Sequence, residues 1–387
     1  MVQEESSTPY NYDYDSGTSF TTFNWAELTP TLMVYSVTFL VGLCGNSLII
    51  VATYRYRKMQ SVTNILLASL ASADLLLIVI CIPVKLAKLF SYTWTMGLIL
   101  CKLVHYMQNL SAICSVLTLT AISIERYYAI LHPMQARYIC TVSQARKVIA
   151  VTWILAILLA TPVIFVQEHM KVGINQTAYW CSKNWENSGL YKAHELYMLL
   201  LVLIIPTIIM TYAYKNICFE VWKVVALRSV MTSREVLEKS RCGSIRTDNV
   251  YINLNDSSKS KSVDNRNEDT KTVRQVIHML VAVVVLFAIC WGPLLIENVL
   301  TAYEKLPFEK IGIHKYVLTA FTLMAYVNSC INPIIYGFMS KNFRDSFQSA
   351  LCCFSRRWQR QNAVNTTNYS TRQISRSSTH TKHTSIR

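Results

Sequence analysis

The feature that most constrains this chain is a series of seven apolar segments, each at least 20 residues long. A 20-residue helix rises about 30 Å, which matches the hydrocarbon thickness of a bilayer. Soluble proteins rarely repeat apolar helices of that length. The pattern therefore predicts an all-α membrane protein, a seven-transmembrane helix bundle over residues 31–338. We place the segments at residues 31–54, 64–90, 98–130, 147–166, 193–226, 274–303 and 313–338.

The distribution of charge predicts how this bundle is oriented. The net charge of +15 alone would suit a nucleic-acid partner, but its distribution argues against one. The first 29 residues hold five acidic residues and no Lys or Arg, whereas nine basic residues follow Phe338. Basic residues also follow the first and third segments, at 55–58 and 137–147. By the positive-inside rule these loops are cytoplasmic, so we expect a multi-pass plasma-membrane protein with an extracellular N-terminus.

The remaining residues predict four further regions. Residues 1–30 form an acidic extracellular tail. Residues 227–270 are polar and lack any apolar run, so we expect a disordered cytoplasmic loop. Residues 339–353 carry apolar side chains at helical spacing with charged ones opposite, which predicts a short amphipathic helix on the membrane lipid. Residues 354–387 form a disordered cytoplasmic tail rich in Ser and Thr.

The cysteines give an independent check on this topology. Of the twelve, only Cys101 and Cys181 fall on the predicted extracellular side, where an oxidising environment favours a disulfide between them. Two free thiols are the alternative. In the same loop, Asn175 begins a glycosylation acceptor. Cys352 and Cys353 follow the amphipathic segment and are candidates for palmitoylation, with free thiols in a reducing compartment as the alternative.

Polar residues inside the segments indicate a functional site. Asp74 lies near the middle of the second segment, with no basic residue within a helical turn or two. A buried carboxylate is costly there, and either a hydrated sodium ion or a proton would remove the penalty. The alternative is a hydrogen-bonded packing cluster. The polar side chains at comparable depth are Asn46, Ser115, Asn328, Ser329 and Asn332.

A set of motifs, one per helix and in order, resembles the rhodopsin-like (class A) G-protein-coupled receptor family over residues 31–353. The motifs are Gly45-Asn46, the Leu70 to Leu75 stretch with Asp74, Glu125-Arg126-Tyr127, Trp153, Pro206 with Tyr214, Cys290-Trp291-Gly292-Pro293, and Asn332-Pro333-Ile334-Ile335-Tyr336. The resemblance implies a receptor that couples to heterotrimeric G proteins. It also implies phosphorylation of the C-terminal tail by receptor kinases, followed by arrestin binding.

The resemblance assigns roles on the cytoplasmic side. Glu125, next to Arg126, would restrain the guanidinium until it is released toward Tyr214 and Tyr336, opening a cleft for a G-protein α subunit. Tyr127 completes that motif. Many family members also place an acidic residue at the base of the sixth helix, but residues 271–274 read Lys-Thr-Val-Arg. Restraint of Arg126 must therefore rely on Glu125.

The sixth and seventh helices carry candidates for moving parts. Pro293 and Pro333 each remove a backbone hydrogen bond and provide natural hinges. Trp291, one turn from Pro293 and beneath the expected ligand cavity, would pass ligand contact to Phe287. Ordinary helix packing and kinking is the alternative at any one of these positions.

The identity of the ligand is narrowed by exclusion. Gln108 stands where amine receptors of the family have an Asp, and Tyr326 stands where opsins have a lysine, which argues against amines and retinal. Gln108 together with Asn298 resembles peptide receptors of the orexin, cholecystokinin and RFamide-peptide group. The polar residues on the outer halves of the helices, which we take as ligand-binding, are Lys85, Gln108, Gln167, Glu195, Glu297, Asn298, Thr322 and Tyr326.

Two of these residues suggest the chemistry of an extracellular peptide ligand. Glu195 and Glu297 could each pair with an arginine of the peptide. The alternative is a solvated helix end paired to a nearby lysine such as Lys192. A receptor for a lipid or another non-amine small molecule remains open.

A transporter or channel is the rival from another class. It would show inverted repeats or charged residues on several helices, whereas the interior charges here are Asp74 and the Glu125-Arg126 pair. No metal cluster, phosphate loop or nucleophile with a positioned base stands out, so we expect neither an enzyme nor a cofactor other than the sodium ion.

Overall fold

The computed structural model describes residues 25–91, 93–172, 178–184, 187–242, 256–306, 312–339 and 343–349. Within these ranges, seven helices are long and apolar enough to cross a membrane, which confirms the seven predicted segments. Each observed span lies within a few residues of its predicted position. The spans are Trp25–Arg55, Val62–Lys88, Gly97–Leu131, Val142–Val166, Ser188–Leu227, Gln275–Ala302 and Ile313–Met339.

Several spans consist of more than one helical element. Short π-helical turns interrupt the second and fifth spans, and side-chain caps begin three helices, as where Ser61 accepts from the amide of Asn64. The elements are α2 (Trp25–Arg55), η1 (Arg57–Met59), α3 (Val62–Leu76), η2 (Leu77–Cys81), α4 (Ile82–Lys88), α5 (Gly97–Leu131), α6 (Pro133–Ile139), α7 (Val142–Ala160), α8 (Val163–Val166), α9 (Ser188–Met198), η3 (Leu199–Ile204), α10 (Ile205–Cys242), α11 (Asp256–Ala302) and α12 (Gly312–Met339).

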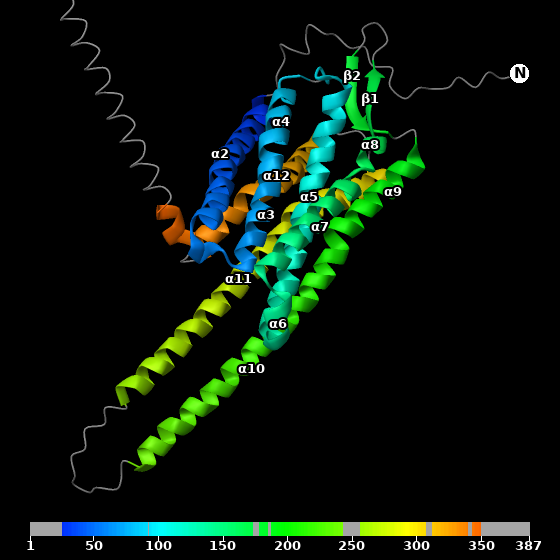
Figure 1. Ribbon diagram of the computed structural model, residues 1–387. Helices are drawn as coiled ribbons and strands as arrows, with labels where there is room; N and C mark the ends of the chain where they lie inside the picture. The colour runs from blue at the N-terminus through cyan, green and yellow to red at the C-terminus, as the bar shows by residue number, and fades with distance from the viewer. Residues whose placement is uncertain are drawn as a thin grey trace, which may run out of the picture.

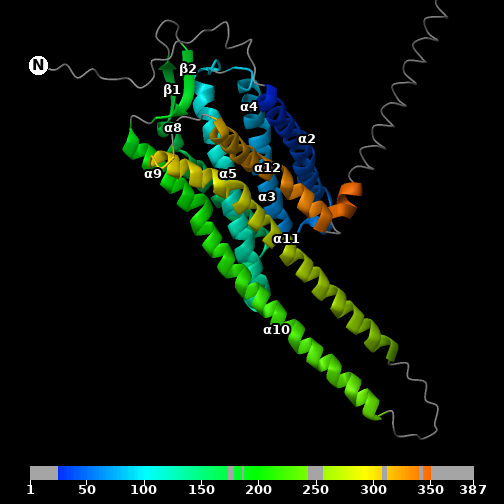
Figure 2. The same ribbon diagram turned by 180° about the vertical axis from the view of Figure 1, so that it is seen from behind.

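The helices form one bundle in which α5 is central (Figures 1 and 2). Helix α5 packs against α3, α7 and α10, while α2 packs against α3 and α12, and α11 packs against α12 and α9. In the most apolar stretch of α5, 61% of residues are buried, compared with 22% in the span that contains α7. The apolar surface that α7 leaves uncovered is suited to lipid, as expected of a membrane bundle.

A close approach between α2 and α12 positions the polar cluster described below. A Cβ atom added at Gly45 would lie 2.6 Å from the Cβ of Pro333, so only glycine allows the helices to come this near. One residue later, the amide of Asn46 donates to the carbonyl of Ser329 across the same contact, at 2.8 Å.

A two-stranded antiparallel hairpin, β1 (Gln167–Val172) with β2 (Ala178–Lys183), covers one end of the bundle (Figure 1). We refer to this end as the hairpin end. The sequence predicted only a loop here. The predicted disulfide between Cys101 and Cys181 is present and ties β2 to α5. The amide of Trp94 also donates to the carbonyl of Tyr179 at 2.7 Å, so the hairpin is attached to two parts of the bundle.

The segment 227–270, expected to be disordered, is corrected by the structure. Helix α10 continues to Cys242 and α11 begins at Asp256, and both project together beyond the bundle, away from the hairpin end (Figures 1 and 2). The sequence has neither Gly nor Pro from residue 207 to 242, nor from 244 to 291. Without these helix breakers, each transmembrane helix continues past its apolar part.

The segment after α12 is described only over residues 343–349, which are helical, as expected for part of the predicted amphipathic helix. Phe343 is buried, and its ring lies 5.6 Å from that of Tyr336 in α12. The glycosylation acceptor Asn175 and the palmitoylation candidates Cys352 and Cys353 lie outside the described residues, as do both chain ends. Those expectations remain predictions.

Candidate ligand and signalling sites

Asp74 is fully enclosed, with 1% of its surface exposed. Its Oδ2 accepts a hydrogen bond from the Nδ2 of Asn332 at 2.8 Å, and Ser329 also lies within hydrogen-bonding reach of this carboxylate. The structure therefore brings α3 and α12 together at the predicted polar cluster. Asn328 is likewise buried in α12.

The donor set around Asp74 fits a sodium ion. The buried Oδ1 of Asn46 and Oγ of Ser115 have no hydrogen-bond partner within the described chain. A buried oxygen without a partner is costly, and a hard cation beside a carboxylate satisfies several such oxygens at once. These residues supply oxygen ligands of the kind that sodium prefers.

The predicted aromatic switch residues lie together on α11. The rings of Phe287 and Trp291 are 6.3 Å apart and both are buried in the main apolar core. Next to them, Gly292 faces Leu203 of η3, and a Cβ added there would lie 3.7 Å from that side chain. Movement of Trp291 would therefore be felt by the fifth span as well as by α11.

Arg126 is held by Glu125 in this structure. Its Nε donates to the Oε2 of Glu125 at 2.6 Å, and a second, terminal guanidinium nitrogen contacts Oε1. The hydroxyl of Thr63 in α3 donates to the same Oε2 at 3.1 Å, which fixes the carboxylate from a neighbouring helix. The arrangement is the restrained form that the sequence predicts, with Thr63 as an additional member.

The tyrosines assigned to signalling surround this pair without hydrogen bonding to Arg126 in the described structure. Tyr214 and Tyr336 are buried, and the hydroxyl of Tyr336 has no hydrogen-bond partner within the described residues. Tyr127 points to another cluster, where its ring lies 6.3 Å from that of Tyr212. The Tyr336 hydroxyl is therefore available for a new partner when Arg126 is released.

Two predicted ligand-binding residues contact each other directly between the third and seventh spans. The hydroxyl of Tyr326 donates to the Oε1 of Gln108 at 3.1 Å, and the ring of Tyr326 packs edge-on against Tyr35 at 5.2 Å. Tyr326 is almost fully buried, whereas Gln108 is only partly so. The contact leaves the amide NH₂ of Gln108 as the polar group that a ligand could use.

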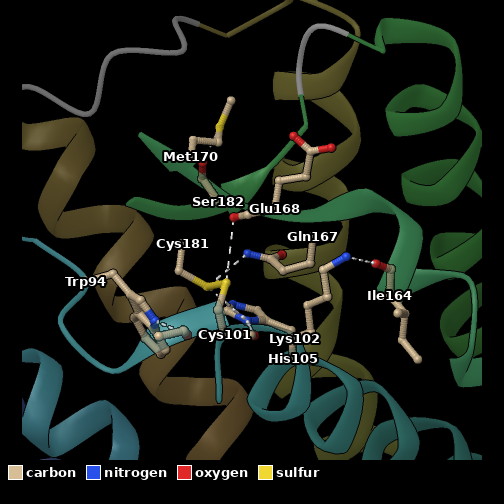
Figure 3. Close-up of a disulfide and its surroundings, with 11 residues drawn as sticks. Trp94, Cys101, Lys102, His105, Ile164, Gln167, Glu168, Met170, Cys181 and Ser182 are labelled. Carbon is tan, nitrogen blue, oxygen red and sulfur yellow. Dashed lines mark hydrogen bonds between the residues drawn. A yellow bond between two sulfur atoms is a disulfide. The ribbon is translucent and has the colours of Figure 1, made fainter. Parts of the chain in front are cut away.

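The disulfide region forms the floor of the hairpin (Figure 3). The Nε2 of Gln167 lies 3.4 Å from the Sγ of Cys181, while the Oε1 of Gln167 is buried without a hydrogen-bond partner in the described chain. On the α5 side, the Nζ of Lys102 donates to the carbonyl of Ile164 at 3.0 Å (Figure 3). Gln167 is thus held at the base of the hairpin.

Glu195 is buried rather than solvated, with 2% of its side chain exposed. Its Oε1 accepts from the Nζ of Lys183, at the end of β2, at 2.8 Å, and lies 3.0 Å from the Nδ1 of His194. The alternative partner Lys192 is wrong for both glutamates, because Lys192 pairs with Glu304 at 3.1 Å.

The other predicted ligand-binding residues occupy different environments. Glu297 is 7% exposed and accepts a hydrogen bond from the hydroxyl of Thr301 at 2.8 Å. The hydroxyl of Thr322 bonds to its own helix, at the carbonyl of Leu318, so it is not directed at a ligand. Asn298 and Lys85 are half-buried on α11 and α4.

Three partners in these sites were missed by sequence reasoning: Lys183, His194 and Thr63. Lys183 could have been suspected, because it lies two residues after Cys181 and therefore on the same face of an extended strand. His194 and Thr63 carry no comparable signal. A lone His or Thr in an apolar helix is uninformative until the neighbouring helix is placed.

The fold and these sites agree with the comparisons to known proteins. Residues 45–336 match the family described as 7 transmembrane receptor (rhodopsin family), and the chain belongs to this family. It is therefore a receptor and a multi-pass membrane protein, not an enzyme.

Among similar proteins, a QRFP-like peptide receptor of Branchiostoma floridae is 31% identical over 84% of this chain and 78% of its own length. The cholecystokinin receptor type A of Cavia porcellus is 32% identical over 83% of this chain and 80% of its own length. A pyroglutamylated RF-amide peptide receptor of Rattus norvegicus is 29% identical over 81% and 68%.

Proposed function

We propose that this receptor binds an extracellular peptide at the hairpin end and activates heterotrimeric G proteins at the opposite end. The observation that carries the ligand class is the pair of buried carboxylates, Glu195 and Glu297, on α9 and α11 at the hairpin end. Buried acids favour a cationic partner such as an arginine side chain. The names of the relatives, which are receptors for peptides, support the same class.

Two observations support placing the hairpin end outside the cell. The disulfide lies there, and disulfides persist in oxidising compartments. Basic residues at 55–58 and 137–147 lie at the opposite ends of their helices, where the positive-inside rule places cytoplasm. On this orientation the N-terminus is extracellular.

The opposite end would then meet the cytoplasmic partners. Arg126 lies near the end of α5 with about a quarter of its side chain exposed, so a G protein can reach it. Receptor kinases and arrestin would act on the Ser-rich and Thr-rich tail, and the helix at 343–349 would rest on membrane lipid. These three partners follow from the family and await direct tests.

We expect Glu297→Gln to weaken activation by arginine-containing amidated peptides about 10- to 100-fold, or roughly 1.4 to 2.8 kcal/mol. The substitution keeps the side-chain shape and removes only the negative charge that attracts a guanidinium. Potency would be measured by a second-messenger assay in cells that express the receptor. Glu304→Gln is the matched control, because Glu304 is 81% exposed and contacts Lys192.

Unchanged potency of the Glu297→Gln variant would contradict the assigned contact. A receptor that responds to lipid extracts and to none of the peptides would instead support the small-molecule alternative.

We also propose that sodium binds at Asp74, with Asn46 and Ser115 as ligands, and stabilises the restrained form. Replacing choline by sodium at constant ionic strength should then stabilise the wild-type protein by about 1 kcal/mol when sodium is near five times its Kd. Asp74→Asn should abolish the gain, because it removes the charge and keeps the shape. Thermal unfolding of the purified receptor measures both. An equal sodium effect in the two proteins would refute this site.

A further inference from the structure

We propose that Lys183 is an internal competitor for the ligand: it occupies the carboxylate of Glu195, and a cationic group of the ligand binds there by displacing it. This inference rests on the proposed function, because it assumes a ligand that enters at the hairpin end. It goes further by naming the residue that the ligand replaces and the contact that is broken.

The ion pair has the geometry of an occupied cation site. The Nζ of Lys183 lies 2.8 Å from the Oε1 of Glu195 and 5.7 Å from the centre of the Tyr191 ring. Both a carboxylate and an aromatic face attract a cation. Since Glu195 is almost fully buried, leaving it without a cation would be strongly unfavourable. Some cation must therefore remain at this position.

The lysine is the partner that can leave. Its side chain is 27% exposed at the end of β2, whereas that of Glu195 is 2% exposed within α9. A lysine side chain is flexible and its ammonium is strongly hydrated, so it can turn into water at modest cost. Glu195 has no comparable route to solvent. Exchange therefore proceeds by replacement of the cation and not of the carboxylate.

A guanidinium is better suited to Glu195 than the ammonium that holds it. Within the described residues, the contacts with Lys183 and His194 both use Oε1, and no hydrogen bond reaches Oε2. Lysine presents a point charge, while a guanidinium can donate to both oxygens at once. The second oxygen is the advantage that an incoming arginine has over Lys183.

The local charge balance also favours an additional cation. Tyr191 interacts electrostatically with both Glu195 and Glu297, so the two carboxylates lie near the same ring. Glu297 forms no ion pair with any Lys, Arg or His in the described part of the chain; its partner is the hydroxyl of Thr301. Two buried carboxylates thus share one ammonium, and a ligand cation reduces this deficit.

Displacement would break one particular connection. Cys181, two residues before Lys183, stays bonded to α5, and the amide of Asn184 donates to the carbonyl of Val166 at 2.7 Å. The hairpin therefore keeps its attachment to α5 and α8, and the link lost is the one to α9. Because α9 continues through η3 into α10, a ligand that replaces Lys183 would release the fifth span from the hairpin.

A small cationic probe tests the exchange without knowledge of the natural ligand. We would measure thermal unfolding of the purified full-length receptor in lipid nanodiscs with increasing arginine amide, using citrulline amide as the uncharged equivalent. In Lys183→Met the apparent Kd of arginine amide should fall about 10-fold relative to wild type, equivalent to roughly 1.4 kcal/mol. Citrulline amide should stabilise neither protein.

The control and a second variant guard against misfolding. Lys171→Met removes the same charge from an exposed position on β1 of the same hairpin, and should leave the apparent Kd at the wild-type value. Lys183→Arg keeps Glu195 paired and competes through both oxygens, so it should raise the apparent Kd about 3- to 10-fold. Equal apparent Kd values in Lys183→Arg, Lys171→Met and wild type would overturn the proposal.

A peptide arm separates this inference from the proposed function. If peptides ending in Arg-Phe-amide activate the receptor, Lys183→Met should lower their half-effective concentration about 10-fold and leave citrulline-containing versions unchanged. An equal effect on both peptides would overturn the inference. If no peptide activates G proteins, the proposed function fails, while the opposite shifts of arginine amide binding in Lys183→Met and Lys183→Arg would still support the exchange.

Discussion

Replacing Arg126 with alanine is expected to reduce agonist-stimulated nucleotide exchange by about 100-fold, in the upper part of the range of coupling free energies between distant sites. In the restrained form the guanidinium is held by Glu125, and Thr63 fixes that carboxylate from α3. On the proposed mechanism, release of Arg126 exposes the cation that accepts the G protein. Without it, the ligand can still shift the helices, but the cytoplasmic partner loses its main contact.

The measurement is nucleotide exchange on purified heterotrimers of each α class, with agonist binding followed in parallel. Arg55→Ala is the matched control, because Arg55 is exposed at the end of α2 and its loss changes the net charge equally. Agonist affinity should be retained in both variants. Normal exchange by the Arg126→Ala protein would rule out the assigned role.

The double substitution Cys101→Ala with Cys181→Ala is expected to lower the free energy of unfolding by roughly 2–4 kcal/mol. The disulfide closes a loop with a sequence separation of 80, and removing it increases the freedom of the unfolded loop. The hairpin would then depend on the contact of Trp94 with Tyr179 and on the Lys183 ion pair. Peptide affinity should fall as well, because Lys183 and Gln167 are no longer held in place.

Thermal unfolding and peptide binding would be measured for the double variant and for Cys218→Ala. Cys218 is free and exposed on α10, so its loss removes a thiol without removing a bridge. Wild-type protein treated with a reducing agent should resemble the double variant. A double variant that unfolds at the wild-type temperature with unchanged affinity would show that the disulfide has no stabilising role.

The membrane-spanning part was predictable because it depends on local properties of the chain. Whether a segment can cross a bilayer follows from the summed hydropathy and length of some 20 consecutive residues, with no need to know what it packs against. The disulfide was predictable for a related reason. Once the topology is assigned, Cys101 and Cys181 are the only two cysteines left on the predicted oxidising side.

The extent of the helices was less predictable at their polar ends. The polar composition of residues 227–270 suggested disorder, whereas α10 and α11 include most of that segment. Polarity shows that a segment leaves the membrane, but it does not show that a helix stops there. The absence of Gly and Pro from residue 207 to 242 was the better guide.

The sequence by itself determined the number of spans, the residues of the polar cluster at Asp74 and the adjacency of Glu125 with Arg126. Only the tertiary structure decided which side chain each of these faces. It placed Thr63 on Glu125, and Lys183 instead of Lys192 on Glu195. Hydropathy accumulates along consecutive residues, whereas a contact between distant residues depends on the rotation and height of two helices and on the path of the hairpin above them.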